Sequence, residues 1–414
     1  MFELNKIEEF APLCLSCLGR AFGKVGFGLD NRERGIEILN QLEIKEGRDL
    51  QERLIVEEID CSLCDGLISE ISNFRDLVID SFSDFSISSF KIGTIVDKDI
   101  LNKEVEFQLL FGENTGEALK SQLNREIGIS VYKELGIEAQ MDNPDAVAIV
   151  DTAYDIVNLE IKSLFVEGNY NKYDRTVPQT RWPCHSCKGV GCGKCNNTGQ
   201  LYPDSVQSLI AHPFTIASSC SEDLFHGMGR EDIDAAMLGT GRPFVLELRM
   251  PKNRNLDLQK IGKKGNTKNI DRVQASELKF VPRSRVAELK NTICDKTYRV
   301  DVSISDKISI ESLKKGAQRL TSTVIEQRTP TRVSHRRADL VRPRLVNSVE
   351  LVSFADGMAE LVIRAQHGTY IRELVSGDGG RTVPSLSSLV DAKCKVEVLD
   401  VLNLHLQEKE AKND

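Results

Sequence analysis

The 414-residue sequence predicts an α+β protein of more than one domain. Helical and strand-like periodicities alternate along the chain, and its length exceeds the roughly 250–300 residues that one hydrophobic core usually serves. Eight of the eleven cysteines fall into CxxC pairs, which is typical of metal knuckles within such domains. Hydrophobic residues make up 40% and charged residues 28%, a composition that excludes collagen-like, disordered and membrane-embedded proteins.

The N-terminal part of the chain favours a mixed α/β domain. Apolar residues recur at helical spacing within 32–58, where Ile36, Leu39 and Ile44 form the expected buried stripe. Residues 116–136 predict a second helix with apolar side chains four positions apart. Strands are expected from short apolar or alternating runs at 86–96, 146–151 and 156–165.

The rest of the chain predicts a connecting segment and a second mixed domain. Residues 166–204 are rich in Gly, Pro, Asn, Cys and Lys, whereas the pattern after residue 205 again mixes helices and strands. Alternating apolar residues predict strands at 297–305 and 359–365. We therefore expect domains at 1–165 and 205–414, joined by an insertion at 166–204.

The two parts carry opposite net charge. Residues 1–150 hold 15 basic and 29 acidic side chains, whereas residues 151–414 hold 39 basic and 33 acidic ones. A polyanion would therefore bind to the second part, although the whole chain has a net charge of −8. We expect a cytoplasmic protein, because no run reaches the roughly 18–20 apolar residues of a membrane span and the start lacks the pattern of a secretory signal.

The paired cysteines indicate structural zinc rather than disulfides in a chain with no secretory signal. Each CxxC supplies two thiolates from one tight turn, and zinc takes four in a tetrahedron. Two pairs lie beside glycines within one short segment, and the two N-terminal pairs must meet in space to share an ion. The sequence leaves the pairing of the knuckles open. The predicted ligands are Cys14, Cys17, Cys61, Cys64, Cys184, Cys187, Cys192 and Cys195.

The densest run of polar residues is HGMGREDIDAAMLGTGRPFVLEL at 226–248. Its glycines favour close approach of the backbone to a ligand. Its carboxylates, Glu231, Asp232 and Asp234, are also numerous enough to hold a divalent cation, which would suit a metal-dependent phosphodiesterase. The run alone does not select a reaction.

Three further stretches carry candidate contacts. Residues 328–345 contain six arginines, which favour planar contacts with phosphate. NYNKYDRTVPQTRW at 169–182 interleaves aromatic residues such as Tyr170 with basic ones such as Lys172, which suits backbone contact and base stacking. In QHGTYIRELVSGDGGRT at 366–382, Tyr370 and Arg372 share one face if the chain is extended.

GREDIDAAMLGTGRPF, NYNKYDRTVPQTRW and GTYIREL together make the chain similar to the archaeal tRNA pseudouridine synthases that modify positions 54 and 55 of the T-arm. The resemblance covers nearly the whole chain, including CLSCLGRAFG at 14–23. It implies a zinc-stapled, THUMP-like α/β domain followed by a catalytic domain with a central mixed, largely antiparallel sheet. It also implies tRNA as the partner, bound through the T-arm and acceptor end, with no cofactor in catalysis, and we expect a monomer.

The resemblance assigns roles to particular residues. Asp232, two positions after an arginine, is implied to be the catalytic aspartate. Arg372 is implied to pair with it, and Tyr298 in KTYRV to contact the base with its ring and to move a proton with its hydroxyl. The other implied substrate-binding residues are Tyr370, Ile371 and Leu399.

One position departs from the family pattern, which reads EDxDxRxLG: Ala236 stands where the family has an arginine. A competing hypothesis is a zinc-dependent RNA-binding module without catalysis, for which Asp232→Asn would change affinity only. The family resemblance favours the enzyme.

Overall fold

The computed structural model describes residues 3–23, 26, 28–112, 116–305 and 307–406. It forms two compact units: Met1–Ser163 with Met250–Asn255, and Leu164–Arg249 with Leu256–Asp414. The strand expected over 156–165 is interrupted, because β4 (Ile156–Ile161) belongs to the first unit and β5 (Leu164–Lys172) to the second. The whole of the expected connecting segment, 166–204, therefore lies within the second unit.

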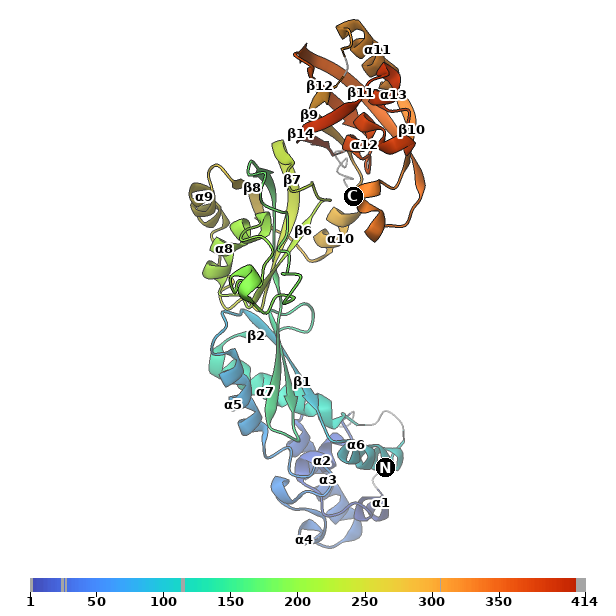
Figure 1. The fold of residues 1–414 in the computed structure, drawn as a ribbon. Coiled ribbons are helices and arrows are strands. Elements are labelled where there is room, and N and C mark those ends of the chain that lie inside the picture. Colours follow the sequence, from blue (N-terminus) through green and yellow to red (C-terminus); the bar gives the residue numbers. More distant parts are fainter. Residues whose placement is uncertain (1–2, 24–25, 27, 113–115, 306, 407–414) are drawn as a thin grey trace. The chain divides into compact units, whose positions relative to one another are not determined.

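The first unit contains a four-stranded sheet in the order β2–β1–β3–β4, with helices α5 and α7 packed on it (Figure 1). β1 is parallel to β2 and β3, whereas β4 is antiparallel to β3. The expected helix near 116–136 is α7, which ends where Gly136 adopts a φ of 66°. The helices and strands not yet given are α1 (Leu4–Glu8), α2 (Leu15–Arg20), α3 (Asn31–Glu46), α4 (Gln51–Leu54), η1 (Glu58–Asp60), α5 (Ile71–Phe82), β1 (Ser89–Ile95), α6 (Lys98–Leu109), α7 (Leu119–Leu135), β2 (Glu138–Ala139) and β3 (Ala146–Asp151).

The apolar stripe predicted for 32–58 is wrong. Ile36 is 39% and Ile44 is 82% exposed, and only Leu39 of the three predicted residues is buried. The buried face of α3 also includes Ile38 and Gly35. A Cβ atom at Gly35 would lie 2.0 Å from the carbonyl oxygen of Leu15, so close packing of α2 on α3 selects this face.

The second unit contains a mixed sheet of ten described strands. Nine follow the order β13–β10–β11–β12–β9–β14–β7–β5–β8, and β6 pairs with β7. The described pairs are antiparallel except β14 with β7, so the predicted mixed, largely antiparallel sheet is confirmed. Its other elements are η2 (Gly193–Cys195), α8 (Val206–Ser218), β6 (Glu222–Gly227), β7 (Ala236–Arg249), α9 (Leu258–Lys268), β8 (Val273–Phe280), α10 (Ser284–Asn291), β9 (Asp295–Ile304), α11 (Ile310–Leu320), β10 (Thr323–Arg328), η3 (Thr331–Arg336), β11 (Val341–Ala355), β12 (Met358–Ala365), α12 (Ile371–Ser376), η4 (Asp378–Gly380), β13 (Thr382–Val383), α13 (Leu386–Val390) and β14 (Cys394–His405).

Two hydrophobic cores meet within this sheet. One surrounds β5–β8, and the other surrounds β9–β12 and α11–α13. The short parallel pairing of β14 with β7 joins them, and Tyr298 packs against both. The expected strands at 297–305 and 359–365 are confirmed as β9 and β12. In the described part of the chain, no helix is long and apolar enough to cross a membrane.

Candidate active site

A cleft of about 450 Å³ lies in the second unit, beside the junction of β7 and β14. All six residues to which the family resemblance assigns a role line it: Asp232, Tyr298, Tyr370, Ile371, Arg372 and Leu399. Further basic residues line the cleft, among them Arg332, Arg337, Lys296 and His367. The fold therefore gathers side chains from a loop, two strands, a short helix and a 3₁₀ turn into one basic depression.

A buried network holds the loop that carries Asp232. Glu231 lies 2.9 Å from the Nε atom of Arg242, and both side chains are 1% exposed. Glu231 also accepts hydrogen bonds of 2.9 and 2.8 Å from the hydroxyl of Tyr170. Because a buried carboxylate is costly unless it is paired, this network fixes the residue immediately before Asp232.

Lys172 fixes the backbone that follows. Its buried ammonium donates to the carbonyl oxygens of Asp232 and Ile233, at 3.3 and 2.7 Å. Burial lowers the pKa of Lys172. The predicted stacking and backbone contacts of Tyr170 and Lys172 with RNA are therefore wrong, since both side chains are fully buried beneath the loop.

The carboxylate of Asp232 projects into the cleft between two arginines. The Nη1 atom of Arg332 lies 3.3 Å from each of its oxygens. The Nε atom of Arg372 lies 3.9 Å from Oδ2, whereas its Nη2 donates to Asp234 at 2.7 Å. Both arginines stabilise the ionised carboxylate, and Arg332 is the nearer one.

Tyr370 and Arg372 do not lie on an extended strand. Tyr370 is the N-cap of α12, and Arg372 lies in its first turn. The hydroxyl of Tyr370 accepts a hydrogen bond of 3.0 Å from Arg337, and the guanidinium of Arg332 lies 5.8 Å from the centre of its ring. Both residues still face the cleft because the helix begins at its edge.

Tyr298 lies at the base of the cleft. Burial raises the pKa of its hydroxyl to about 12, so the group remains a hydrogen-bond donor at neutral pH. Lys296 lines the cleft two residues earlier on β9, where burial, reinforced by the charge of Arg242, lowers its pKa to about 8. The cleft thus offers groups that can hold or move a proton near the ionised Asp232.

The glycines and carboxylates of 226–248 act differently from what the sequence suggested. A Cβ atom at Gly239 would lie 1.9 Å from the carbonyl oxygen of Leu402, so this glycine lets β7 approach β14 rather than a ligand. Glu231, Asp232 and Asp234 each contact a different arginine. Among the described residues, the groups of three or more metal-ligating residues with ligand atoms within 4.8 Å of one another are the two cysteine clusters, which argues against a metal held by these three carboxylates.

Ala236 is buried at the start of β7, opposite Asp400 of β14. The carboxylate of Asp400 is fully buried and contacts Arg175 and Arg299. The departure from the family pattern therefore lies four residues after Asp232, at a position where Arg175 and Arg299 already neutralise the acid on the neighbouring strand.

The cysteines form the two clusters that can hold metal. Cys14, Cys17, Cys61 and Cys64 converge in the first unit, and Cys184, Cys187, Cys192 and Cys195 converge in the second. Tetrahedral zinc–thiolate bonds of about 2.3 Å require sulfur atoms of this proximity. In the first cluster, shared thiol hydrogen bonds raise the pKa of Cys14 and lower that of Cys61.

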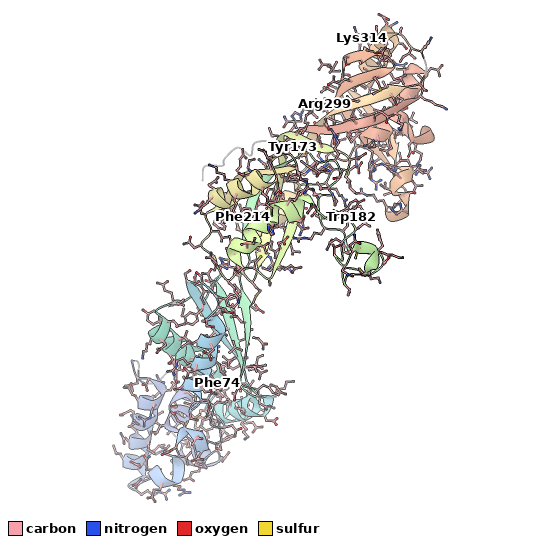
Figure 2. All side chains as sticks on the ribbon, turned by 60° about the vertical axis from the view of Figure 1, so that its left-hand side comes forward. Phe74, Tyr173, Trp182, Phe214, Arg299 and Lys314 are labelled. Carbon is pink, nitrogen blue, oxygen red and sulfur yellow. The ribbon has the colours of Figure 1, made fainter. Side chains whose placement is uncertain are left out.

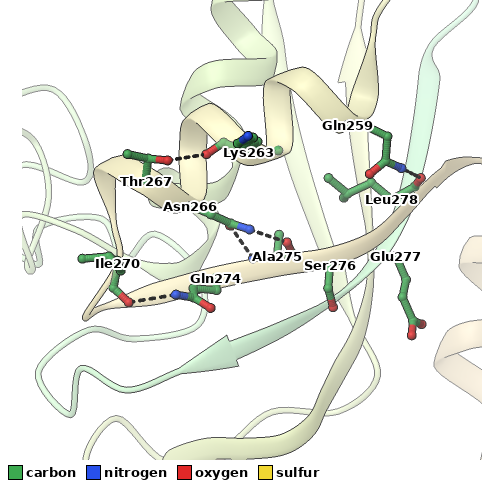
Figure 3. A pocket seen from close by; sticks show the side chains of 11 residues that line it. Gln259, Lys263, Asn266, Thr267, Ile270, Gln274, Ala275, Ser276, Glu277 and Leu278 are labelled. Atoms are coloured by element: carbon green, nitrogen blue, oxygen red, sulfur yellow. Dashed lines mark hydrogen bonds between the residues drawn. The ribbon is translucent and has the colours of Figure 1, made fainter.

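A second depression lies between α9 and β8 (Figure 3). Its lining is mainly amide, hydroxyl and lysine side chains, with Asn266 bonded to the backbone of Ala275 at both its oxygen and its nitrogen. Glu277 is the one acid that lines it. This depression lacks the paired acid and arginines that make the first cleft suitable for catalysis.

Sequence comparison identifies the family. The family model described as "Pus10, C-terminal" matches residues 165–405, and the family model described as "Pus10 THUMP domain, archaeal" matches residues 74–151. The chain belongs to the Pus10 family. Two Pus10 relatives named tRNA pseudouridine synthase Pus10, from Methanothrix thermoacetophila and Methanopyrus kandleri, are 38% and 37% identical to it. Each match covers 96% of this chain, with 93% and 96% of the relatives' own lengths.

Among solved structures, a Cbf5–Nop10–Gar1 complex contains a chain that is 12% identical to this Pus10 protein, with a TM-score of 0.34. The match covers 59% of this chain and 50% of the other. A similarity this weak supports no conclusion about function.

Sequence reasoning missed the contacts of two residues in this Pus10 site. Arg332 was assigned to phosphate binding within an arginine-rich run, but it contacts Asp232. Glu373 was not singled out, although it binds Arg332 at 2.8 Å. The signal that could have found Glu373 is an acid within the short, mainly apolar sequence IRELV, because a buried acid needs a cationic partner.

Proposed function

We propose that this protein is a tRNA pseudouridine synthase that isomerises uridine 54, uridine 55 or both in the T-loop. The observation that carries the proposal is the cleft of a Pus10 chain in which Asp232 lies between two arginines and near Tyr298 and Tyr370. The relatives named tRNA pseudouridine synthase Pus10 support this reaction over others.

The reaction suits these side chains. Conversion of uridine to pseudouridine breaks the N1–C1′ bond, turns the base and joins C5 to C1′, with no net redox change and hence no need for a cofactor. An ionised Asp232 either attacks C1′ or removes a proton from the sugar. Tyr298 supplies a ring face for the uracil and a protonated hydroxyl, while Arg332 and Arg372 face the carboxylate of Asp232.

Tyr370, Ile371 and Leu399 complete the substrate pocket in this proposal. The target base must leave the stacked T-loop to reach Asp232, so base flipping precedes the chemistry. Exposed arginines of residues 328–345 bind phosphates of the T-arm, and the first unit binds the acceptor end of the tRNA through a local surface. In this proposal the first unit is the RNA-binding domain and the second unit, which includes residues 166–204, is the catalytic domain.

We further propose that each cysteine cluster binds one structural zinc ion. The chemistry of four thiols within 4.8 Å fits zinc, and neither cluster lies among the residues that line the cleft. We also propose that the protein acts in the cytoplasm as a monomer, which light scattering coupled to size exclusion can test.

The test is tritium release from a tRNA transcript labelled at uracil C5, because forming the C5–C1′ bond expels that hydrogen. Wild type should release tritium in EDTA, and Asp232→Asn should release none while binding tRNA normally. Asp234→Asn is a matched variant in the same loop, which removes a charge beside Arg372 and should retain measurable release. Mapping the product then assigns position 54, position 55 or both.

Other results would contradict the proposal. Tight binding without release, by protein whose zinc content is intact, would establish a binding module without catalysis. Shortened RNA that depends on added magnesium or manganese would establish a phosphodiesterase. Equal release by wild type and Asp232→Asn would keep the reaction and reject the assigned residue.

A further inference from the structure

Glu373 is a buried acid that the reaction does not itself require. It lies in α12 between Arg372 and the buried Leu374, and only 5% of its surface is exposed. Its Oε1 atom accepts a hydrogen bond of 2.8 Å from the Nε atom of Arg332. Its other oxygen is buried with no hydrogen-bond partner among the described residues. A buried carboxylate is costly, so its contact with Arg332 has to account for its presence.

Arg332 connects Glu373 to the catalytic carboxylate. Its Nε atom binds Glu373, while its Nη1 atom lies 3.3 Å from both oxygens of Asp232. A guanidinium is planar and rigid, so fixing one nitrogen orients the others. Burial disfavours the charge of Arg332, but the hydrogen bond and charge of Glu373, aided by Asp232, raise its pKa above the usual value.

Arg372 cannot replace this contact. Its Nη2 atom donates to Asp234 and its Nη1 to the carbonyl oxygen of Val396, which leaves Nε at 3.9 Å from Asp232. The sequence resemblance assigned the pairing role to Arg372, yet Arg332 makes the closer approach.

We infer that Glu373 is a positioning residue, which acts through Arg332 to orient the carboxylate of Asp232 for attack on the ribose. The inference rests on the proposed function. Arg332 belongs to η3, in the connection between β10 and β11, so this ion pair also fastens that connection to α12. Asp232 is thus aligned by a chain of contacts from a buried acid, rather than by one arginine alone.

The first test is Glu373→Gln, which keeps the size of the side chain and removes its charge. Without its anchor, Arg332 spends less time beside Asp232. We expect kcat for tritium release to fall by about 10- to 100-fold, the usual cost of a misaligned reacting group, with tRNA affinity unchanged. The loss should appear in kcat and not in KM, which is the split expected when a reacting group is misaligned rather than when tRNA binding weakens.

Substitutions of Arg332 test the direction of the coupling. Arg332→Met should lower kcat at least as far as Glu373→Gln, and Arg332→Lys should restore little, because one ammonium cannot hold both carboxylates as the planar fork does. The double variant Arg332→Met/Glu373→Gln should be no slower than Arg332→Met. Additive losses in this cycle would overturn the inference, because Glu373 would then act independently of Arg332.

Glu167→Gln is the matched control for stability. Glu167 is also a buried acid of the second unit, and its Oε1 accepts a 2.8 Å hydrogen bond from the Nε atom of Arg285, but it does not line the cleft. It should lower the Tm about as much as Glu373→Gln and leave kcat unchanged. If Glu167→Gln lowers kcat equally, or Glu373→Gln leaves kcat unchanged, the positioning role is wrong. Loss of the proposed function is recognised separately, since wild type would then release no tritium.

Discussion

The two cysteine clusters contain the same ligands but occupy different surroundings. Cys14, Cys17, Cys61 and Cys64 are at most 1% exposed and form part of the hydrophobic core of the first unit. In the second unit, three of the four cysteines are half-exposed, and none belongs to either core. Figure 2 shows the segment beyond the labelled Trp182 projecting from the body of that unit.

This difference separates two uses of one metal motif. In the first unit the cluster fills space that apolar side chains would otherwise fill, so metal binding and core formation are one event. In the second unit the cluster holds a short loop, whose tip residue Val190 is 90% exposed. A metal bound there would replace a core that so short a segment cannot form.

The largest expected effect comes from breaking the buried cluster. Cys64→Ser removes a ligand that is 0% exposed, and we expect the first unit to lose about 5 kcal/mol or more of its free energy of unfolding. Cys192→Ser is the matched change in the second cluster and should cost the second unit about 1 kcal/mol, with faster hydrogen exchange confined to its own loop. Thermal unfolding and hydrogen exchange measured by segment check both. Similar losses from the two variants would remove the distinction.

The next effect concerns charge beside the buried cluster. Four thiolates with the proposed zinc ion would carry net negative charge, and Arg20 is fully buried beside Cys17. Burial disfavours its charged form, but interactions with Cys17 and Glu104 raise the pKa of Arg20. Its Nη1 atom pairs with Glu104, while its Nε and Nη2 atoms have no hydrogen-bond partner among the described residues. Arg20 is therefore suited to compensate the charge of a zinc–thiolate group.

Arg20→Gln should destabilise the first unit by about 3–5 kcal/mol, because it leaves the buried Glu104 without its cationic partner. Zinc should also dissociate faster in competition with a chromogenic chelator. Arg125→Gln is the control: Arg125 is 40% exposed, its contact with Glu117 lies at the surface, and its loss should cost less than about 1 kcal/mol. Unchanged zinc release in Arg20→Gln would show that the arginine serves only Glu104.

The same contrast explains what the sequence could predict. CxxC pairs are local signals, so all eight cysteines could be grouped before their surroundings were known. A role for Asp232 could be predicted from the sequence because its motif is contiguous. Glu373 and Arg332 are 41 positions apart, and their meeting depends on how β10, β11 and α12 pack. Arginines in a run are usually exposed to solvent, so the sequence predicted that Arg332 binds phosphate.

The burial of polar residues was the other feature that the sequence did not predict. Tyr170 and Lys172 belong to residue types that are commonly exposed, yet both lie under the Asp232 loop because β5 is central in its part of the sheet. Ile36 and Ile44 show the opposite error, because they were predicted to be buried but are exposed. Helical spacing defines a possible stripe, but the close approach of α2 at Gly35 decides which stripe is buried.

The smallest expected effect concerns the link between the exposed cluster and the cleft. Trp182 lies 5.4 Å beneath the guanidinium of Arg230, which lines the cleft two residues before Asp232. Its carbonyl accepts a 2.8 Å hydrogen bond from Leu201, on the far side of the cysteine loop. Trp182→Ala should lower kcat/KM for tritium release by about threefold, the value of one exposed cation–π contact, with zinc content unchanged.

Trp182→Phe keeps a ring and should recover most of that loss. Cys192→Ser should reproduce the Trp182→Ala value, because a loosened loop no longer holds the indole under Arg230. If Cys192→Ser leaves kcat/KM unchanged while Trp182→Ala lowers it, the exposed cluster stabilises only its own loop and the indole is held by the T-shaped contact with Tyr202. The second zinc would then be independent of the cleft as well as of the cores, which makes the contrast with the buried cluster sharper.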